Sequence, residues 1–256
     1  MKKRFTLWLI VAVVLALLAC GRKAPQPRQI INLMDAGASI EPEAQQLGFQ
    51  SLQKVVSSLR RGDSLTVIPV TGDAGNETEG HILRITLAER RETYDQDLRR
   101  AAMDLRRSLE QTRTAVLQNP GSHTDILGAF RLASEEIRLA GQGRKAVILA
   151  LSDFIQDDDQ FNFKTNQTLR NAASAQVFGA DLSRRDQLSL QGVPIFLGLL
   201  RSRDLGRMSP RRRSAIKTFW LSYLSTAGAT PVLAEDGPGL LDTFLKGEPV
   251  AAKSHK

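Results

Sequence analysis

The sequence is poor in the residues that build disulfide frameworks and zinc sites. Among its 256 residues it has one cysteine, so no disulfide can form within the chain. Its three histidines, at positions 81, 123 and 255, do not lie in a Cys/His cluster with the spacing of metal ligands. No internal repeat is evident, and 42% of the residues are apolar, which excludes a collagenous or mainly disordered chain. We therefore expect a globular protein without zinc chemistry.

The sequence also lacks an apolar run long enough to span a bilayer. Three basic residues at positions 2–4 precede an apolar run at positions 5–19, in which Thr6 is the only polar residue. A spanning helix needs about 20 apolar residues, so the pattern indicates a secretory signal peptide rather than a retained anchor. Cleavage after residue 19 would make Cys20 the first residue of the mature chain.

Residues 17–20, with the sequence Leu-Leu-Ala-Cys, resemble the lipobox of bacterial lipoproteins. The resemblance implies a diacylglyceryl thioether on Cys20 and an acyl chain such as palmitate on its amino group. Together these supply the more than one lipid chain that stable membrane anchoring requires. The resemblance also implies a place in the bacterial cell envelope, facing the periplasm, and Gly21 favours the outer membrane under the family's sorting rule. The alternative is an uncleaved anchor that ends at an incidental cysteine.

We expect four consecutive segments in the chain. Residues 1–19 form the signal peptide, 20–28 the lipidated cysteine and a proline-containing tether, 29–245 one folded domain, and 246–256 a C-terminal tail. The third segment is long enough to bury one substantial hydrophobic core.

Apolar segments with the periods of strands and helices alternate through the predicted domain. Apolar runs predict strands at residues 29–34, 65–70, 81–87, 146–151, 193–200 and 231–233. Apolar residues spaced by three and four predict helices at residues 42–59, 98–116, 126–137, 167–176, 209–224 and 240–245. Strands separated by helices indicate a doubly wound, mostly parallel α/β sheet with right-handed crossovers.

Acidic and hydroxyl side chains follow two of the predicted strands. Asp35 follows the first strand, and Asp153 follows the strand at 146–151, which should lie at the centre of the sheet because it is apolar throughout. Ligands of doubly wound sheets bind beyond the carboxyl ends of the strands. Two carboxylates brought together there would repel one another unless a cation compensates them, and oxygen ligands favour a hard divalent ion.

This pattern resembles a von Willebrand factor A (vWA) domain in three segments. They are Asp-x-Gly-x-Ser at residues 35–39, Gly-Ser-His-Thr-Asp-Ile at residues 121–126, and Asp153. In that family a metal-ion-dependent adhesion site joins an Asp-x-Ser-x-Ser loop, a Thr and a further Asp. The resemblance implies a site for Mg²⁺ or another divalent cation with the ligands Asp35, Ser39, Thr124 and Asp153. It implies a non-enzymatic module that covers about residues 29–245 and binds a protein partner, whose acidic side chain is the last ligand of the cation.

Two residues depart from the family pattern and make the predicted site degenerate. Gly37 stands where the first Ser of the family motif supplies a coordinating hydroxyl, so the site is short of one ligand. A water molecule could replace it, because Mg²⁺ commonly retains several waters. Phe154 follows Asp153 where the family commonly has Gly.

Several of these residues also have purely structural interpretations. Asp35 and Asp125 could cap helices, Ser39 could bond to loop backbone, and Thr124 could simply start a helix. When Asp125, Ser39 and Thr124 are each considered singly, we prefer the structural interpretation.

Three further groups of residues stand out in the sequence. We interpret the acidic residues 157–159 as a solvated loop rather than a calcium site, because they lack spaced ligands. The aromatic residues Phe219, Trp220 and Tyr223 are expected in the core. Residues 211–213, all arginine, are interpreted as a solvated helix start, with contact to anionic lipid as a hypothesis.

Two functions of other classes remain open at this point. One is a magnesium-dependent phosphohydrolase of the haloacid-dehalogenase type with Asp35 as nucleophile, although position 37 lacks the second acid of that chemistry. The other is a structural subunit of the envelope. The net charge of +8 would allow nucleic acid as a partner, but three of these charges belong to the signal peptide. The remaining +5 on an envelope-facing domain indicates an acidic protein or an anionic membrane surface instead.

Overall fold

The computed structural model describes residues 26–35, 37, 39–70, 72, 81–118, 123–235 and 241–246. The predicted signal peptide, Cys20, most of the tether and residues 247–256 of the predicted tail lie outside this part, as do Gly121 and Ser122. Within the described part, no helix combines the length and the apolar character needed to cross a bilayer.

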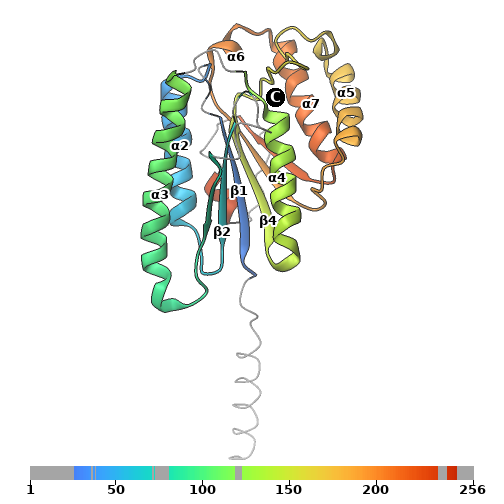
Figure 1. The fold of residues 1–256 in the computed structure, drawn as a ribbon. Coiled ribbons are helices and arrows are strands. Elements are labelled where there is room, and N and C mark those ends of the chain that lie inside the picture. Colours follow the sequence, from blue (N-terminus) through green and yellow to red (C-terminus); the bar gives the residue numbers. More distant parts are fainter. Residues whose placement is uncertain are drawn as a thin grey trace, which may run out of the picture.

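A six-stranded sheet forms the centre of the molecule (Figure 1). Its strands, in chain order, are β1 (Arg28–Asp35), β2 (Ser64–Val70), β3 (Leu83–Thr86), β4 (Lys145–Ser152), β5 (Pro194–Leu199) and β6 (Thr230–Ala234). They lie in the order β3-β2-β1-β4-β5-β6, and every neighbouring pair is parallel except β2 and β3. The predicted fold class, a doubly wound and mostly parallel α/β sheet, is confirmed.

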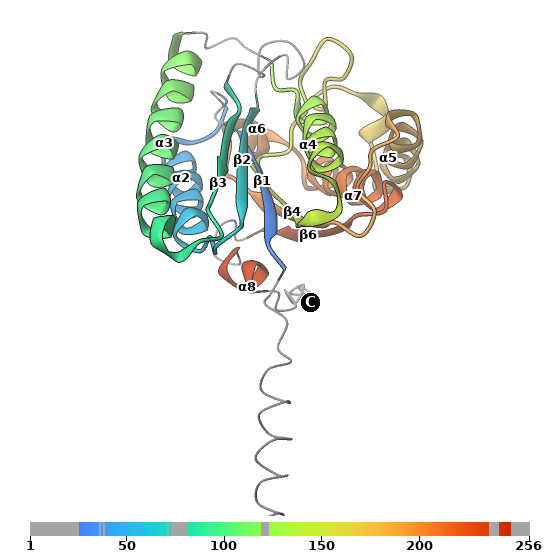
Figure 2. The same ribbon diagram turned by 60° about the horizontal axis from the view of Figure 1, so that its bottom comes forward.

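Helices cover both faces of the sheet (Figures 1 and 2). The helices α2 (Pro42–Ser57), α3 (Arg91–Gln118) and α8 (Leu241–Leu245) pack on one face, and α4 (Ile126–Ala140), α5 (Ala172–Asp186) and α7 (Pro210–Thr226) on the other. The short α6 (Arg203–Arg207) lies at the carboxyl ends of the strands. Two short 3₁₀ helices, η2 (Gly141–Gly143) and η3 (Gln167–Leu169), precede β4 and α5.

The central strands are apolar on both faces because both faces are buried. In β1, Ile31 and Leu33 belong to the core under α4 and α7, whereas Ile30 and Met34 belong to the core under α2 and α3. This alternation follows from the two-residue period of a strand. It explains why the sequence shows a continuous apolar run here rather than an alternating one.

Three predicted elements differ from the structure in extent. The helix predicted at 167–176 is instead η3 followed by α5, because the side chain of Asn171 accepts a hydrogen bond from the Ser174 amide and caps a new helix there. The helix predicted at 98–116 begins earlier, at Arg91. The strand predicted at 81–87 is a four-residue edge strand, antiparallel to β2.

The aromatic residues of α7 lie in the core, as expected. Phe219, Trp220 and Tyr223 are each fully buried. The indole of Trp220 donates a hydrogen bond of 2.8 Å to the carbonyl oxygen of Phe154, so α7 is fixed to the chain that follows β4.

Candidate functional site

The crevice between β1 and β4 is the switch point of this sheet. The chain continues from β1 to β2 on one side of the crevice and from β4 to β5 on the other side. Asp35 is the last residue of β1. Ser152 is the last residue of β4, and Asp153 directly follows it. The strands pair in register up to Met34 and Leu151, so Asp35 is level with Ser152, and Asp153 lies one residue beyond it. We call this side of the sheet, at the carboxyl ends of the parallel strands, the site edge.

Asp35 is a buried carboxyl group with two hydrogen bonds. Only 1% of the residue is exposed. The hydroxyl of Ser152 donates to Oδ2 at 2.6 Å, and the amide of Gly37 donates to Oδ1 at 2.8 Å. Burial raises the pKa of Asp35 above its ordinary value, and the two hydrogen bonds oppose this rise.

Asp153 lies beside Asp35 and is equally buried. Its Oδ1 accepts a hydrogen bond of 2.9 Å from the Ile155 amide, and its Oδ2 accepts one of 3.3 Å from the Ser39 hydroxyl. Burial, followed by the charge of Asp35, raises the pKa of Asp153 to about 7. The hydrogen bonds from Ile155 and Ser202 act in the opposite direction. Among the described residues, the charged groups that act on the pKa of Asp153 are the carboxylates of Asp35 and Asp204, and both raise it.

Backbone pairing with the chain after β5 positions Ser39. The amide of Arg203 donates to the carbonyl oxygen of Ser39 at 3.1 Å, and the amide of Glu41 donates to that of Arg201 at 3.0 Å. Ile40 and Ser202 thus form an isolated antiparallel bridge. The loop after β1 is thereby fixed to the segment that leads into α6.

A second backbone bridge positions Thr124. Its amide donates to the carbonyl oxygen of Asp157 at 2.7 Å, and the amide of Asp157 donates back to Thr124 at 3.0 Å. The following residue, Asp125, caps α4 by accepting a hydrogen bond from the Gly128 amide. The structural interpretation of Asp125 as a helix cap is therefore confirmed.

Gly37 lies close to three of the four predicted ligands. A Cβ atom added to it would be 2.9 Å from Asp35 Oδ1, 3.6 Å from Thr124 Oγ1 and 3.8 Å from Ser39 Oγ. Asp153 joins the group through its hydrogen bond with Ser39. The structure thus brings together Asp35, Ser39, Thr124 and Asp153, all on loops or strand ends at the site edge.

Phe154 has the backbone conformation that glycine adopts most readily. Its φ is 59°, in the left-handed region, where a bulky residue is uncommon. The side chain is buried, and its ring lies 6.1 Å from that of Trp220. Aromatic packing therefore holds the residue after Asp153 in the turn that a glycine would take without strain.

The prediction for the acidic loop is correct for one of its three residues. Asp159 is solvated, with its side chain 98% exposed. Asp157 instead pairs with Lys164 at 2.6 Å and accepts a hydrogen bond from Asn162. Asp158 accepts hydrogen bonds from the amides of Gln160 and Phe161 and from the side chain of Gln156. These two carboxylates hold the loop together, because they satisfy donors that a tight turn leaves without backbone partners.

The prediction of a solvated arginine cluster at the start of α7 is wrong for two of its three residues. Arg211 is exposed. Arg212 donates to the carbonyl oxygen of Phe163 at 3.0 Å, and Arg213 donates to those of Leu205 and Met208. These side chains satisfy carbonyl oxygens at the ends of loops and of α6, so they are partly buried.

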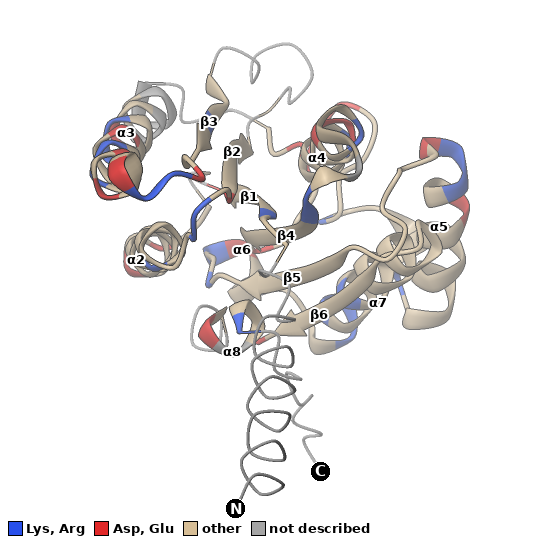
Figure 3. Cartoon of the chain, turned by 90° about the horizontal axis from the view of Figure 1, so that it is seen from below, with Lys and Arg blue, Asp and Glu red and all other residues tan. Residues whose placement is uncertain are grey.

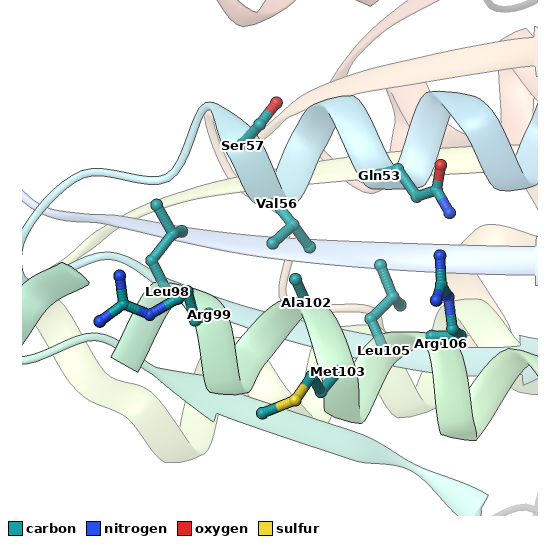
Figure 4. A pocket seen from close by; sticks show the side chains of 9 residues that line it. All are labelled: Gln53, Val56, Ser57, Leu98, Arg99, Ala102, Met103, Leu105 and Arg106. Atoms are coloured by element: carbon teal, nitrogen blue, oxygen red, sulfur yellow. The ribbon is translucent and has the colours of Figure 1, made fainter. Parts of the chain in front are cut away.

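Two hollows lie at different places on the molecule. One of about 270 Å³ adjoins Asp153 and is lined by Asp153, Phe154, Leu199, Arg201, Leu205, Arg213, Ile216, Lys217, Trp220, Leu233 and Glu235. The other, of about 490 Å³, lies between α2 and α3, where Val56, Leu98 and Leu105 form an apolar seam beside Arg99 and Arg106 (Figure 4). Only the first adjoins the predicted site, and no carboxyl group lines the second.

Two residues at the site edge received no role from the sequence. The hydroxyl of Ser152 donates a hydrogen bond to Asp35 and also accepts one of 2.9 Å from the amide of Phe154. Gln156, fully buried, accepts the amides of Ile126 and Leu127 and so holds the start of α4 against the loop after β4. The place of Ser152 directly before Asp153 in the sequence could have indicated its role. The role of Gln156 could not be read from the sequence, because it depends on a contact with residues 29 and 30 positions away.

Among the described residues, no group of three or more His, Cys, Asp or Glu side chains is arranged to hold a metal ion. The candidate donor set is of another kind. It consists of two carboxylates, Asp35 and Asp153, and the two hydroxyls of Ser39 and Thr124. Such oxygen donors suit Mg²⁺, which binds one or two carboxylates and retains several waters.

No family model matches this sequence, and no curated protein does. Among solved structures, the chain is similar to a von Willebrand factor type A protein from Catenulispora acidiphila, with 13% identity and a TM-score of 0.46. That match covers 87% of this chain and 42% of the other. The human COPII-coat protein Sec24c matches with 10% identity and a TM-score of 0.46, over 88% of this chain and 32% of the other. The chain therefore spans less than half the length of either protein.

Proposed function

We propose that the protein is a non-enzymatic, vWA-like interaction module of the bacterial cell envelope. It is anchored by a lipid on Cys20 and binds a protein partner through a divalent cation at the site edge. The observation that carries the proposal is the pair of buried carboxyl groups, Asp35 and Asp153, next to one another, whose hydrogen-bond donors among the described residues are hydroxyls and backbone amides. Burial of two such charges is costly unless a cation compensates them.

The proposed ligands are the two carboxylates and the hydroxyls of Ser39 and Thr124. A bound Mg²⁺ would supply the missing positive charge and leave a coordination position for an acidic side chain of the partner. The hydroxyl that Gly37 does not provide is replaced by water in this proposal. The protein contributes the positions of its oxygens, which two backbone bridges and the burial of the carboxyl groups fix in advance.

The hollow beside Asp153 extends the proposed partner surface. Its apolar lining includes Leu205, Ile216 and Leu233, and Arg201 lies at the same hollow as an exposed cation. The partner segment that suits this surface has an acidic side chain for the metal and an apolar neighbour for the hollow. Its overall charge is acidic, which complements Arg201.

The geometry of Asp35 favours binding over phosphoryl transfer. Both of its oxygens already accept hydrogen bonds, and the residue two positions later is a glycine rather than a second acid. A nucleophilic carboxylate of the haloacid-dehalogenase type needs that acid. Turnover of phosphoesters that Asp35→Asn abolishes would favour the hydrolase instead.

Affinity purification of the lipoprotein from detergent-solubilised membranes tests the binding function. Purification with Mg²⁺ and with a chelator should differ in one captured protein, which the Asp153→Ala variant also fails to retain. The same partner captured equally well under all three conditions would eliminate the metal mechanism and leave a metal-independent contact.

Gly37 offers a sharper test of the metal site with a matched control. We expect Gly37→Ser to bind Mg²⁺ severalfold more tightly than the natural chain, because it adds the missing hydroxyl between Asp35, Thr124 and Ser39. Gly37→Ala adds the same Cβ, which would lie 2.9 Å from Asp35 Oδ1 and must displace it, but this variant adds no ligand. It should therefore bind Mg²⁺ more weakly than the natural chain. Titration calorimetry measures both, and equal affinities for the two variants would contradict the site.

A further inference from the structure

The edge of the sheet opposite the site is strongly basic. It consists of the loops at residues 58–63, 87–91 and 141–145, which surround Pro27, and we call it the amino edge. Its exposed cations are Arg60, Arg61, Arg90, Arg91 and Lys145, whereas its exposed acids are Glu89 and, in the first turn of α3, Glu92. Seen from below, Lys and Arg positions gather around the beginnings of β1 and β4 (Figure 3).

Direct contacts place these loops around the point where the chain enters the domain. The amide of Lys145 donates to the carbonyl oxygen of Pro27 at 2.9 Å, and Arg144 donates to that of Gly62 at 3.0 Å. A Cβ added at Gly62 would lie 3.1 Å from the ring of Pro27 and 3.4 Å from the side chain of Glu89. The basic loops and the entry point therefore form one continuous surface.

A buried ion pair removes one acid from the charge balance of this surface. Asp63 is fully buried and forms hydrogen bonds with the backbone amide and the guanidinium of Arg28. Its charge is compensated inside the domain. The exposed arginines and lysine consequently outnumber the exposed acids that remain at the amino edge.

The tether limits how far this surface can lie from a lipid on Cys20. The seven residues from Gly21 to Pro27 span at most about 25 Å when fully extended. Strand β1, with eight residues, extends about 26 Å in the other direction, toward the site edge. The amino edge is thus the side of the domain that the anchor brings closest to the bilayer.

We infer that the amino edge is a docking surface for anionic lipid headgroups, which orients the domain so that the site edge faces away from its own membrane. The inference rests on the lipid anchor proposed above. Lys and Arg next to a negatively charged leaflet are attracted to it within about one Debye length, roughly 10 Å at 0.1 M salt. Arg201 before α6, Arg207 at its end and Arg211 at the start of α7 are exposed on the chain that follows the carboxyl end of β5, so they take no part in this contact.

Two glycines provide labelling positions for a test of this orientation. Neither Gly143, at the amino edge, nor Gly206, in α6 at the site edge, would meet any atom within 4 Å through an added Cβ. Cys20 is the only cysteine of the chain, and its sulfur is blocked when it carries the lipid. A fluorophore on Gly143→Cys or Gly206→Cys of the mature lipoprotein is therefore the single label.

The experiment measures energy transfer from each fluorophore to an acceptor on lipid headgroups. Vesicles contain phosphatidylcholine alone or with phosphatidylglycerol. We expect severalfold stronger transfer from position 143 than from position 206 in the anionic vesicles, and a much smaller difference at high salt or in neutral vesicles. The variant Arg61→Gln, Arg90→Gln, Lys145→Gln should reduce the difference toward that in neutral vesicles, whereas the charge-matched control Arg201→Gln, Arg207→Gln, Arg211→Gln should retain it in full.

The possible failures are distinguishable. Equal transfer from both positions, or stronger transfer from position 206, would overturn the orientation although the protein floats with the vesicles. A natural mature chain that takes the fluorophore on Cys20 and does not float would instead overturn the lipid anchor, and the orientation with it. Circular dichroism of both triple variants shows whether they are folded, and a label difference retained in the folded amino-edge variant would also overturn the inference.

Discussion

The two ends of the sheet bury carboxyl groups in opposite ways. At the amino edge, Asp63 is fully buried and accepts hydrogen bonds from the amide, Nε and Nη2 of Arg28, at 2.7, 3.0 and 2.7 Å, and from the amide of Arg60 at 2.9 Å. At the site edge, Asp35 and Asp153 are as deeply buried, and each carboxyl carries a raised pKa. Among the described residues, the donors that hydrogen-bond to these two carboxyl groups are serine hydroxyls and backbone amides. The first arrangement thus includes a positive side chain of the same domain, whereas the second is built on neutral donors.

This difference separates structural from functional burial of charge. A carboxylate that exists to stabilise the fold has its counter-ion built in, because an uncompensated buried charge destabilises the domain. A pair of carboxylates without one is a stability cost that the fold bears at a place where ligands of doubly wound sheets bind. Three predictions test this contrast, beginning with the largest effect.

Asp63→Ala should cause the largest loss of stability. It leaves the Arg28 guanidinium, whose side chain is 13% exposed, without its partner, and we expect the free energy of unfolding to decrease by about 3–5 kcal/mol. Urea unfolding measures the change. Asp159→Ala, which removes an exposed carboxylate, is the control and should leave the unfolding midpoint unchanged. A loss no greater than that of the control would show that the ion pair at the amino edge is not structural.

Asp153→Asn should raise the free energy of unfolding in the absence of divalent cations, whereas Asp63→Ala lowers it. Between the ordinary pKa of 3.8 and about 7, folded Asp153 retains a proton that the unfolded chain has released. The free energy of unfolding of the natural chain should therefore be greatest below pH 4 with respect to this group and fall as the pH rises through 7. At pH 8 the variant should be more stable than the natural chain, by up to about 4 kcal/mol, with a flatter pH dependence.

Parallel urea titrations of both chains at several pH values, with chelator present, measure this linkage. Mg²⁺ should then reduce the difference at pH 8, because it stabilises the natural chain more than the variant. A variant that is less stable than the natural chain across the whole pH range would indicate that Asp153 is compensated within the domain, as Asp63 is.

The sequence was sufficient to predict the sheet. Continuous apolar runs at 29–34 and 146–151 identify strands buried on both faces, and such strands lie at the centre of a doubly wound sheet. The fold class places Asp35 and Asp153 at the same end of the sheet, whereas their proximity depends on the strand order, in which β1 and β4 are neighbours. The hydroxyls of Ser39 and Thr124 followed from the family resemblance rather than from this argument.

The sequence was not sufficient where long-range contacts decide the role of a residue. Arg212 and Arg213 resemble a solvated helix start, but they donate to carbonyl oxygens, as far along the chain as that of Phe163. Asp63 received no role from the sequence, but it is fully buried and pairs with Arg28 at the start of β1. Local patterns report amphipathicity and caps, whereas the partner of a charged side chain depends on tertiary packing.

Ser39→Ala should produce the smallest change in stability and still affect the proposed function. The bond from its hydroxyl to Asp153 is 3.3 Å long, so its loss should lower the free energy of unfolding by only about 0.5 kcal/mol. If Ser39 is a ligand, the same variant should bind Mg²⁺ several times more weakly in titration calorimetry at pH 8. Asp63→Ala, examined under conditions in which it remains folded, should bind Mg²⁺ as the natural chain does, because Asp63 lies at the opposite edge. Should Ser39→Ala bind Mg²⁺ with unchanged affinity, its hydroxyl would be a loop contact, and the carboxylates alone would carry the charge contrast between the two edges.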